Sequence, residues 1–201
     1  MTFVVASNND KKVEEIERIL ASIGHTAVSA KQLGILLEPE ETANSFYGNA
    51  TIKALAFFEH TEMPVIADDS GLMVEALGGA PGVMTARYSG PNSTNDSNIS
   101  KLLKELESIE LQDRTAWFVS AIVLVMPDNR IISALGYTRG FIGYEKRGEN
   151  GFGYDPIFYI EGNRSYAELS DMQKNSISHR GRALRKIAFK LRNIYRVKGR
   201  L

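Results

Sequence analysis

Two adjacent carboxylates, Asp68 and Asp69, follow a short apolar run and precede Ser70 and Gly71. The run predicts a β-strand, Val65–Asp69, and neighbouring side chains of a strand point to opposite faces. Both carboxylates can therefore face solvent only if the strand ends there; otherwise a cation holds one of them inside the protein. The pair is typical of a divalent-metal site, and an exposed acidic turn is the alternative that the pair alone leaves open.

A second acidic pair, Glu40 and Glu41, lies in a loop before a predicted helix. Together with Asp68 and Asp69 it supplies oxygen ligands suited to Mg²⁺. This ion takes few carboxylates, keeps several waters and shares its remaining positions with substrate phosphate. The alternative is a solvated acidic surface, which we prefer for Glu38.

A polar turn follows the first predicted strand, before an amphipathic helix, and consists of Ser7, Asn8, Asn9, Asp10, Lys11 and Lys12. A helix N-terminus presents unpaired N–H groups and the positive end of the helix dipole, which together bind phosphate. Lys12 adds a charge on the first turn. The Walker A pattern is absent. Without a ligand, the same residues would serve only as helix caps.

A glycine-rich segment, Gly151–Pro156, places Phe152 and Tyr154 around Gly153 and ahead of Asp155. Glycines let a ligand approach the backbone, an exposed phenyl ring can stack on a base, and a carboxylate can accept hydrogen bonds from purine N–H groups. The segment therefore predicts a base-binding loop; a hairpin with aromatic core anchors is the alternative.

Charge is distributed unevenly along the chain. Residues 174–201 carry ten basic and no acidic side chains, whereas residues 1–173 carry fourteen basic and twenty-four acidic ones. The basic segment could bind nucleic acid, pack onto the acidic body or border an anion-binding cleft. Within it, His179 and Arg180 could donate to carbonyl or phosphate oxygens. Ser178 and His179 are adjacent, which disfavours a nucleophilic dyad.

The elements that must position these residues alternate irregularly, which predicts a mixed α/β fold rather than strict βαβ repetition. We expect strands at 2–6, near Val28, and at 65–69, 115–126 and 131–144. We expect helices at 11–23, 44–60, 98–109 and 181–197, and a further helix start at the capping box Ser170–Gln173. Asn49 and Lys53 share one face of the second helix.

Composition excludes several classes of protein. The 201 residues contain no cysteine, so a disulfide framework and a thiolate zinc site are excluded. No apolar run approaches the roughly 20 residues of a membrane helix, and no secretory signal is apparent. We expect a cytoplasmic protein.

Blocks of residues in a fixed order resemble the inosine triphosphate pyrophosphatase (Ham1) family. They run from residue 7 to residue 184 and comprise Ser7-x-Asn9-x-x-Lys12-x-x-Glu15, Phe46-x-x-Asn49-Ala50-x-x-Lys53-Ala54, Ala67–Leu72, Leu77–Gly82, Ala86–Gly90, Gly151–Pro156 and Ser178–Leu184. Two features depart from the pattern: Asn8 stands where many relatives have glycine, and the His179 block is followed by a longer, more basic tail.

The resemblance implies an enzyme that converts non-standard purine triphosphates (ITP, dITP, XTP) to the monophosphate and pyrophosphate. It also implies one domain, residues 1–201, of two lobes around a long twisted mixed sheet, with a substrate cleft between the lobes. Mg²⁺ dependence and a homodimer follow from the same resemblance, with no nucleic-acid or membrane partner.

The resemblance also implies roles for individual residues. Ser7–Lys12 and Lys53 would hold the triphosphate, and Asp69 would activate the attacking water while binding Mg²⁺ with Glu41. Ser70 would contact phosphate or sugar. Further residues would bind the purine: Phe152 by stacking, with Gly153 and Tyr154 beside it, and Asp155, Lys174, His179 and Arg180 at its edge.

Discrimination between these purines and adenine would depend on the purine 6-oxo group, which accepts hydrogen bonds from Lys174, His179 or Arg180. Adenine presents an amine there and leaves such donors unpaired, at about 1–3 kcal/mol each, so two losses give about 10²–10⁴-fold rejection. Two other hypotheses remain at this stage: a nucleic-acid-binding module built on the basic segment, and a nucleotide-binding relative without activity.

Overall fold

The computed structural model describes residues 1–197, with side chains as far as Ile194. The end of the basic segment, residues 198–201, lies outside the described residues. The strands are β1 (Thr2–Val5), β2 (Thr26–Ser29), β3 (Val65–Val74), β4 (Thr115–Val125), β5 (Ile131–Ile142), β6 (Phe158–Ile160) and β7 (Arg164–Ser165). The helices are α1 (Asp10–Ser22), α2 (Phe46–Phe58), α3 (Asn95–Glu105), α4 (Asp171–Ile177) and α5 (His179–Val197).

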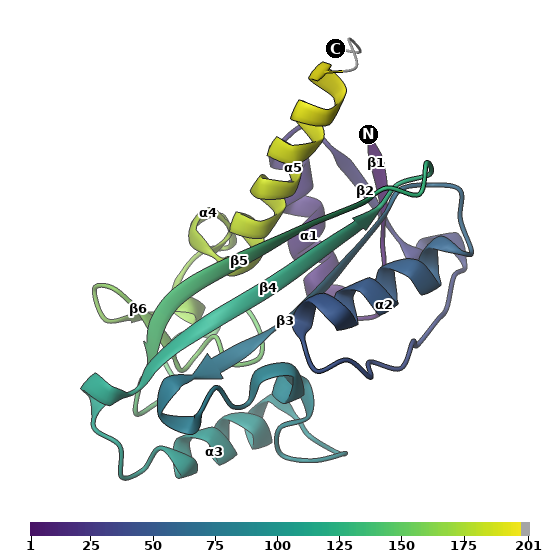
Figure 1. Ribbon diagram of the computed structural model, residues 1–201. Helices are drawn as coiled ribbons and strands as arrows, with labels where there is room; N and C mark the ends of the chain where they lie inside the picture. The colour runs from purple at the N-terminus through teal and green to yellow at the C-terminus, as the bar shows by residue number, and fades with distance from the viewer. Residues whose placement is uncertain (198–201) are drawn as a thin grey trace. The chain divides into compact units, whose positions relative to one another are not determined.

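The seven strands form one mixed sheet in the order β2-β1-β3-β4-β5-β6-β7 (Figure 1). Strand β1 pairs in parallel with β2 and β3, whereas β6 pairs antiparallel with β5 and β7. The prediction of a mixed α/β fold is confirmed.

The chain divides into two compact units. The first unit contains Met1–Asp69, Ser120–Gly136 and α5, and the second contains Ser70–Val119 and Tyr137–Ser178. Strands β3, β4 and β5 each contribute residues to both units.

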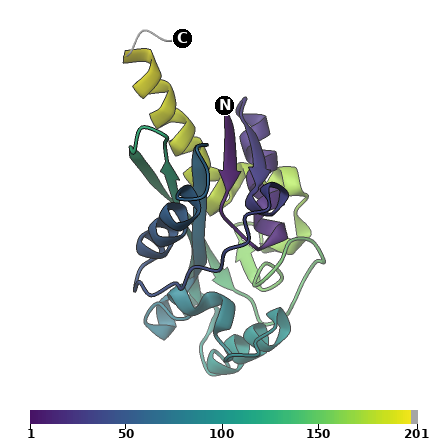
Figure 2. The same cartoon turned by 90° about the vertical axis from the view of Figure 1, so that its right-hand side faces the viewer.

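In the first unit, the alternation of strand side chains separates two apolar clusters. Ile66 of β3 and Ile122 and Leu124 of β4 pack with α1 and α5, together with Leu184 and Ile187. The intervening residues of the same strands pack with α2: Val65, Ala67, Ala121, Val123 and Val125 meet Ala50, Ala54 and Phe57. Helices α1 and α2 therefore cover opposite faces of these strands (Figure 2).

The second unit has its own core. Apolar side chains of α3 (Ile99 and Leu102) pack with an aromatic group, in which the rings of Phe158 and Tyr166 lie 4.9 Å apart. The guanidinium of Arg114, 2% exposed, donates to the carbonyls of Leu106 and Gly143 at 2.6 and 3.3 Å. It thus satisfies the carbonyl oxygen of the α3 C-cap, Leu106, and that of Gly143 just after β5.

Most predicted elements are confirmed to within a few residues, and two boundaries that differ bear on the site. Strand β3 does not end at Asp69 and continues to Val74. Helix α5 begins at His179 rather than Gly181, directly after α4, whose predicted capping box of Ser170 and Gln173 is present. In both cases the sequence contains polar residues that are typical of a loop, but in the structure these residues are buried.

Candidate active site

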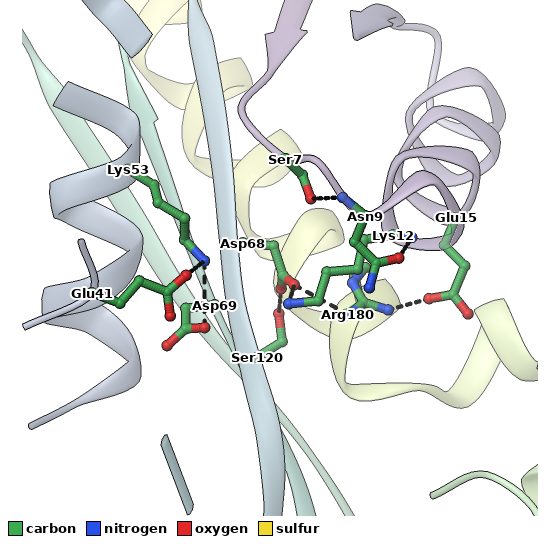
Figure 3. Close-up of polar contacts among 10 residues, drawn as sticks. All are labelled: Ser7, Asn9, Lys12, Glu15, Glu41, Lys53, Asp68, Asp69, Ser120 and Arg180. Carbon is green, nitrogen blue, oxygen red and sulfur yellow. Dashed lines mark hydrogen bonds and ion pairs between the residues drawn. The ribbon is translucent and has the colours of Figure 1, made fainter. Parts of the chain in front are cut away.

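Strand β3 directs Asp68 and Asp69 to opposite sides (Figure 3). Asp68 lies on the same face of the strand as Ile66, toward α1 and α5. Asp69 lies on the same face as Val65 and Ala67, toward α2. The strand therefore continues through the pair with both carboxylates buried, at 1% and 6% exposed. The exposed acidic turn is therefore wrong, and the cations beside Asp68 in this structure are Lys12 and Arg180.

Cations and a hydroxyl surround Asp68. Its Oδ2 atom lies 3.1 Å from both Lys12 Nζ and Arg180 Nη2, and Ser120 Oγ donates to its Oδ1 at 2.6 Å. Burial alone would raise the pKa of Asp68, but Arg180 and Lys12 outweigh it and hold that pKa well below its usual range. Asp68 is therefore a fixed anion.

Arg180 joins Asp68 to helix α1. Its guanidinium is 1% exposed and pairs with Glu15 of α1 as well as with Asp68. Lys12, four-fifths or more buried, stands one turn before Glu15, and burial lowers its pKa although Asp68 opposes the effect. Two cations and two carboxylates thus form one buried network, in which removal of a single partner leaves a buried charge uncompensated.

Asp69 has a different environment on the α2 side. Its Oδ1 lies 3.4 Å from Lys53 Nζ, which also contacts Glu41 Oε1 at 2.9 Å. Burial raises the pKa of Asp69 in spite of Lys53 and Lys12. Burial would lower the pKa of Lys53, but Asp69 and Glu41 outweigh it and raise that pKa. Lys53 thus lies within ion-pair distance of both carboxylates.

The second carboxylate oxygen of Asp69, Oδ2, is buried and has no hydrogen-bond partner among the described residues. A buried carboxylate oxygen without a partner is costly and normally has a ligand. The described residues contain no group of three or more His, Cys, Asp or Glu side chains that could hold a metal ion by themselves. Asp69 and Glu41 fit Mg²⁺, which binds through one or two carboxylates and completes its coordination with water and phosphate.

The polar turn before α1 has the geometry of a helix N-terminus. Asn9 is the N-cap, and its side chain accepts a hydrogen bond from the Lys12 N–H at 3.1 Å. Ser7 Oγ accepts from the Asn9 N–H at 3.2 Å, and Asn8 donates to the Leu37 carbonyl at 2.9 Å. Asp10 and Lys11 are exposed on the first turn. Lys12 is the one lysine of this turn that points to the buried carboxylate.

In the second unit, the side chain of Asp155 organises the glycine-rich loop. Asp155 Oδ2 accepts from the Phe152 N–H at 2.8 Å and from Lys174 Nζ at 2.7 Å. A Cβ at Gly151, whose φ is +77°, would lie 2.1 Å from the same oxygen. The half-buried Phe152 ring has Lys174 Nζ 4.9 Å from its centroid. Asp155 and Lys174, predicted to meet the purine edge, are thus brought together as a buried ion pair that fixes Phe152.

The other predicted residues have varied positions. Tyr154 is a core residue, 5% exposed, and its hydroxyl donates to the Thr85 carbonyl at 3.0 Å, which leaves its backbone rather than its ring for a ligand. Gly153 has a φ of +62° and open space where a Cβ would lie. Ser70 is 8% exposed in β3, and His179 is buried at the first position of α5.

Sequence reasoning missed Ser120, and it assigned no role to Glu15. Each had a detectable signal. Ser120 is the one hydroxyl residue between Ala116 and Met126 in an otherwise apolar strand, and Glu15 lies between Val13 and Ile16 on the apolar face of its helix. A single polar residue on a buried face indicates a buried partner.

The sequence and the mixed sheet match those of a known class of proteins. A model of the Ham1 family matches residues 3–190, and the chain belongs to this family. Among curated relatives, the dITP/XTP pyrophosphatase of Clostridium tetani is 44% identical over 196 residues, which cover 96% of each chain. The dITP/XTP pyrophosphatase of Bacillus subtilis is 42% identical over 92% of this chain and 94% of its own.

Solved structures support the same assignment. The Staphylococcus aureus Ham1 protein superposes with a TM-score of 0.83 at 39% identity, over 96% of this chain and 99% of its own. A Mycobacterium abscessus structure described as a nucleoside-triphosphatase / dITP/XTP pyrophosphatase gives 0.73 at 44% identity, over 93% and 98%. The predicted family and its fold are confirmed.

Proposed function

We propose that this protein hydrolyses non-standard purine nucleoside triphosphates (dITP, XTP and ITP) to the nucleoside monophosphate and pyrophosphate. Membership of the Ham1 family and the names of its 42–44% identical relatives support this activity. The observation that carries it is Asp69: one oxygen contacts Lys53, and the other is buried without a hydrogen-bond partner among the described residues.

The first unit would bind the triphosphate. The turn Ser7, Asn8, Asn9, Asp10, Lys11 and Lys12 would present N–H groups at the positive end of α1 to phosphate oxygens, with Lys12 and Lys53 as counter-charges. In the structure both lysines face carboxylates, Asp68 and Asp69, so phosphate would compete with these ion pairs. The carboxylates therefore hold the lysines in position before the substrate arrives.

Asp69 would act as the general base. A water molecule would transfer a proton to Asp69 while its oxygen bonds to phosphorus, and the anhydride P–O bond between the α- and β-phosphates would break. The electron pair of that bond would pass to the leaving phosphate oxygen, which Lys12 and Lys53 would stabilise. Such positioned proton transfer contributes about 10²–10⁴-fold to a rate.

Glu41 and Asp69 would hold Mg²⁺ together with substrate phosphate. When bound, the ion supplies positive charge that offsets the phosphate oxygens. Lys53 contacts both carboxylates and limits their mutual repulsion when no ion is bound.

The second unit would bind the purine base through the glycine-rich loop, with the Phe152 ring stacked on the base. Asp155 and Lys174 would fix the loop through their 2.7 Å ion pair, and Gly153 and the backbone of Tyr154 would line it. His179 and Arg180 would donate to the 6-oxo group, and Ser70 would contact phosphate or sugar. We also propose, on the strength of the family resemblance, that the chain forms a single catalytic domain.

Among the described residues, no helix is long and apolar enough to cross a membrane. We further propose a cytoplasmic location and a homodimer, on the strength of the family resemblance. Gel filtration with light scattering would test the dimer.

Pyrophosphate release from ITP, dITP, XTP, GTP and ATP at fixed Mg²⁺ tests the activity, with chromatography to identify the nucleotide product. We expect monophosphate and pyrophosphate from ITP, dITP and XTP and little from ATP. Release of orthophosphate instead, equal turnover of ATP and ITP, or binding without turnover would each contradict the proposal.

A further inference from the structure

Strand β5 and the first turn of α5 come unusually close at Gly136, in the first unit. A Cβ at Gly136 would lie 2.0 Å from the His179 carbonyl oxygen and 2.7 Å from the Ala183 nitrogen. Both are backbone atoms, which have no rotamer by which to move away. The φ of Gly136 is not in the left-handed region, so space rather than backbone conformation requires glycine here.

The rest of α5 is fastened to the same strand. Lys186 Nζ donates to the Leu135 carbonyl at 2.7 Å, and Lys190 Nζ donates to the Ser133 carbonyl at 2.5 Å. The buried residues Leu184 and Ile187 hold the helix further against the core. Helix α5 runs beside β5 in Figure 1. A side chain at position 136 would therefore displace the first turn more than the body of the helix.

That first turn carries the residue that links three elements. Arg180, 1% exposed, pairs with Glu15 of α1 and with Asp68 of β3. Asp68 in turn holds Lys12 at 3.1 Å. Because buried side chains are close-packed, a shift of the first turn is transmitted to these partners rather than absorbed. Lys53 and Glu41 lie with Asp69 on the other side of β3.

We propose that Gly136 is a positioning residue for nucleotide binding: the side chain it lacks lets the first turn of α5 lie against β5 and so sets the positions of His179, Arg180 and, through Asp68, Lys12. The proposal rests on the proposed function for its kinetic consequences. Gly136 would thus affect substrate binding, whereas proton transfer to Asp69 takes place on the other face of β3, toward α2.

The test is Gly136→Ala, with Gly140→Ala as the matched control. Gly140 lies four residues along the same strand, and a Cβ there would lie 2.4 Å from the Tyr159 carbonyl oxygen, a comparable clash that does not involve α5. For Gly136→Ala we expect KM for ITP to rise about tenfold to a hundredfold, because His179 and Arg180 are displaced, with a smaller fall in kcat through the displaced Lys12. For Gly140→Ala we expect the KM of the wild-type protein.

Equal KM in the two variants, or a fall in kcat without a change in KM for Gly136→Ala, would overturn the proposal. Should Gly136→Ala fail to fold, Ala183→Val adds a larger side chain at the same contact, on the helix side. Its KM must rise in the same way, and a wild-type KM would again overturn the proposal.

A crystal structure of Gly136→Ala supplies a measurement that does not depend on activity. We expect the His179 carbonyl to move away from β5 and the Arg180–Asp68 contact to lengthen from 3.1 Å. A first turn in its original position would overturn the proposal. Wild-type hydrolysis of ITP separately tests the proposed function, so either one can fail alone.

Discussion

The two sides of strand β3 hold neighbouring carboxylates in opposite ways. Asp68 has two cations and a hydroxyl within 3.1 Å and a pKa well below its usual range, because Arg180 and Lys12 outweigh its burial. Asp69 has one cation at 3.4 Å, an oxygen without a partner among the described residues, and a pKa raised by burial. The first arrangement suits a permanent anion that supports structure, and the second suits a group that exchanges protons and ligands.

The substitution Asp69→Asn tests the functional side of β3 and has the largest expected effect. The amide keeps the shape of the side chain but cannot accept the proton of water, so kcat for ITP should fall about 10²–10⁴-fold. Binding of ITP should persist, measured by calorimetry, and thermal unfolding should confirm that the variant is folded. Turnover within tenfold of the wild-type protein would remove Asp69 from its proposed role.

The substitution Asp68→Asn tests the structural side. It leaves Lys12 and one side of Arg180 buried without a carboxylate, so the free energy of unfolding should fall by about 3–5 kcal/mol. Urea unfolding measures the loss. Glu145→Gln is the control, since Glu145 is exposed and should change stability by less than about 0.5 kcal/mol. A loss for Asp68→Asn as small as that of the control would erase the distinction between the two sides of β3.

The difference between the two carboxylates could be predicted from the sequence only in part. Strand alternation requires that Asp68 and Asp69 face opposite ways wherever the strand continues. The partners of Asp68, however, come from positions 12, 120 and 180, and only the folded chain brings them together. The strand was predicted to end at Asp69, where its apolar run stops; Asp is also depleted in strands, and tertiary ion pairing outweighed that local preference.

Periodic segments were easier to predict than polar ones. The apolar stripes of α1 and α2 and the long apolar run of β4 gave their positions to within a few residues, since burial of one face depends on local spacing. Asp155 shows the opposite case: its type did not reveal that its oxygen accepts hydrogen bonds from the Phe152 N–H and from Lys174 of α4. The type of a residue constrains its chemistry but not its partner.

The substitution Ser120→Ala sharpens the description of Asp68. It removes a buried hydrogen bond of 2.6 Å to a charged acceptor, so stability should fall by about 1.5–3 kcal/mol in urea unfolding. This is less than for Asp68→Asn because both ion pairs remain. Stability unchanged by Ser120→Ala would mean that the two cations alone fix the Asp68 carboxylate.

The substitution Glu41→Gln tests whether the α2 side holds a metal ion, and its expected effect is the smallest. Loss of one carboxylate should raise the Mg²⁺ concentration for half-maximal activity by about tenfold, since changes at metal-binding residues or their neighbours have effects of at least this size. Stability should change little, because the Glu41 side chain is 30% exposed and its ion pair with Lys53 is only partly shielded from water. Glu38→Gln is the matched control, an exposed acid of the same loop that should leave the Mg²⁺ requirement unchanged. If both variants need the same Mg²⁺ concentration as the wild-type protein, Glu41 does not bind the ion. The two sides of β3 would then differ only in that Asp69 accepts a proton and Asp68 does not.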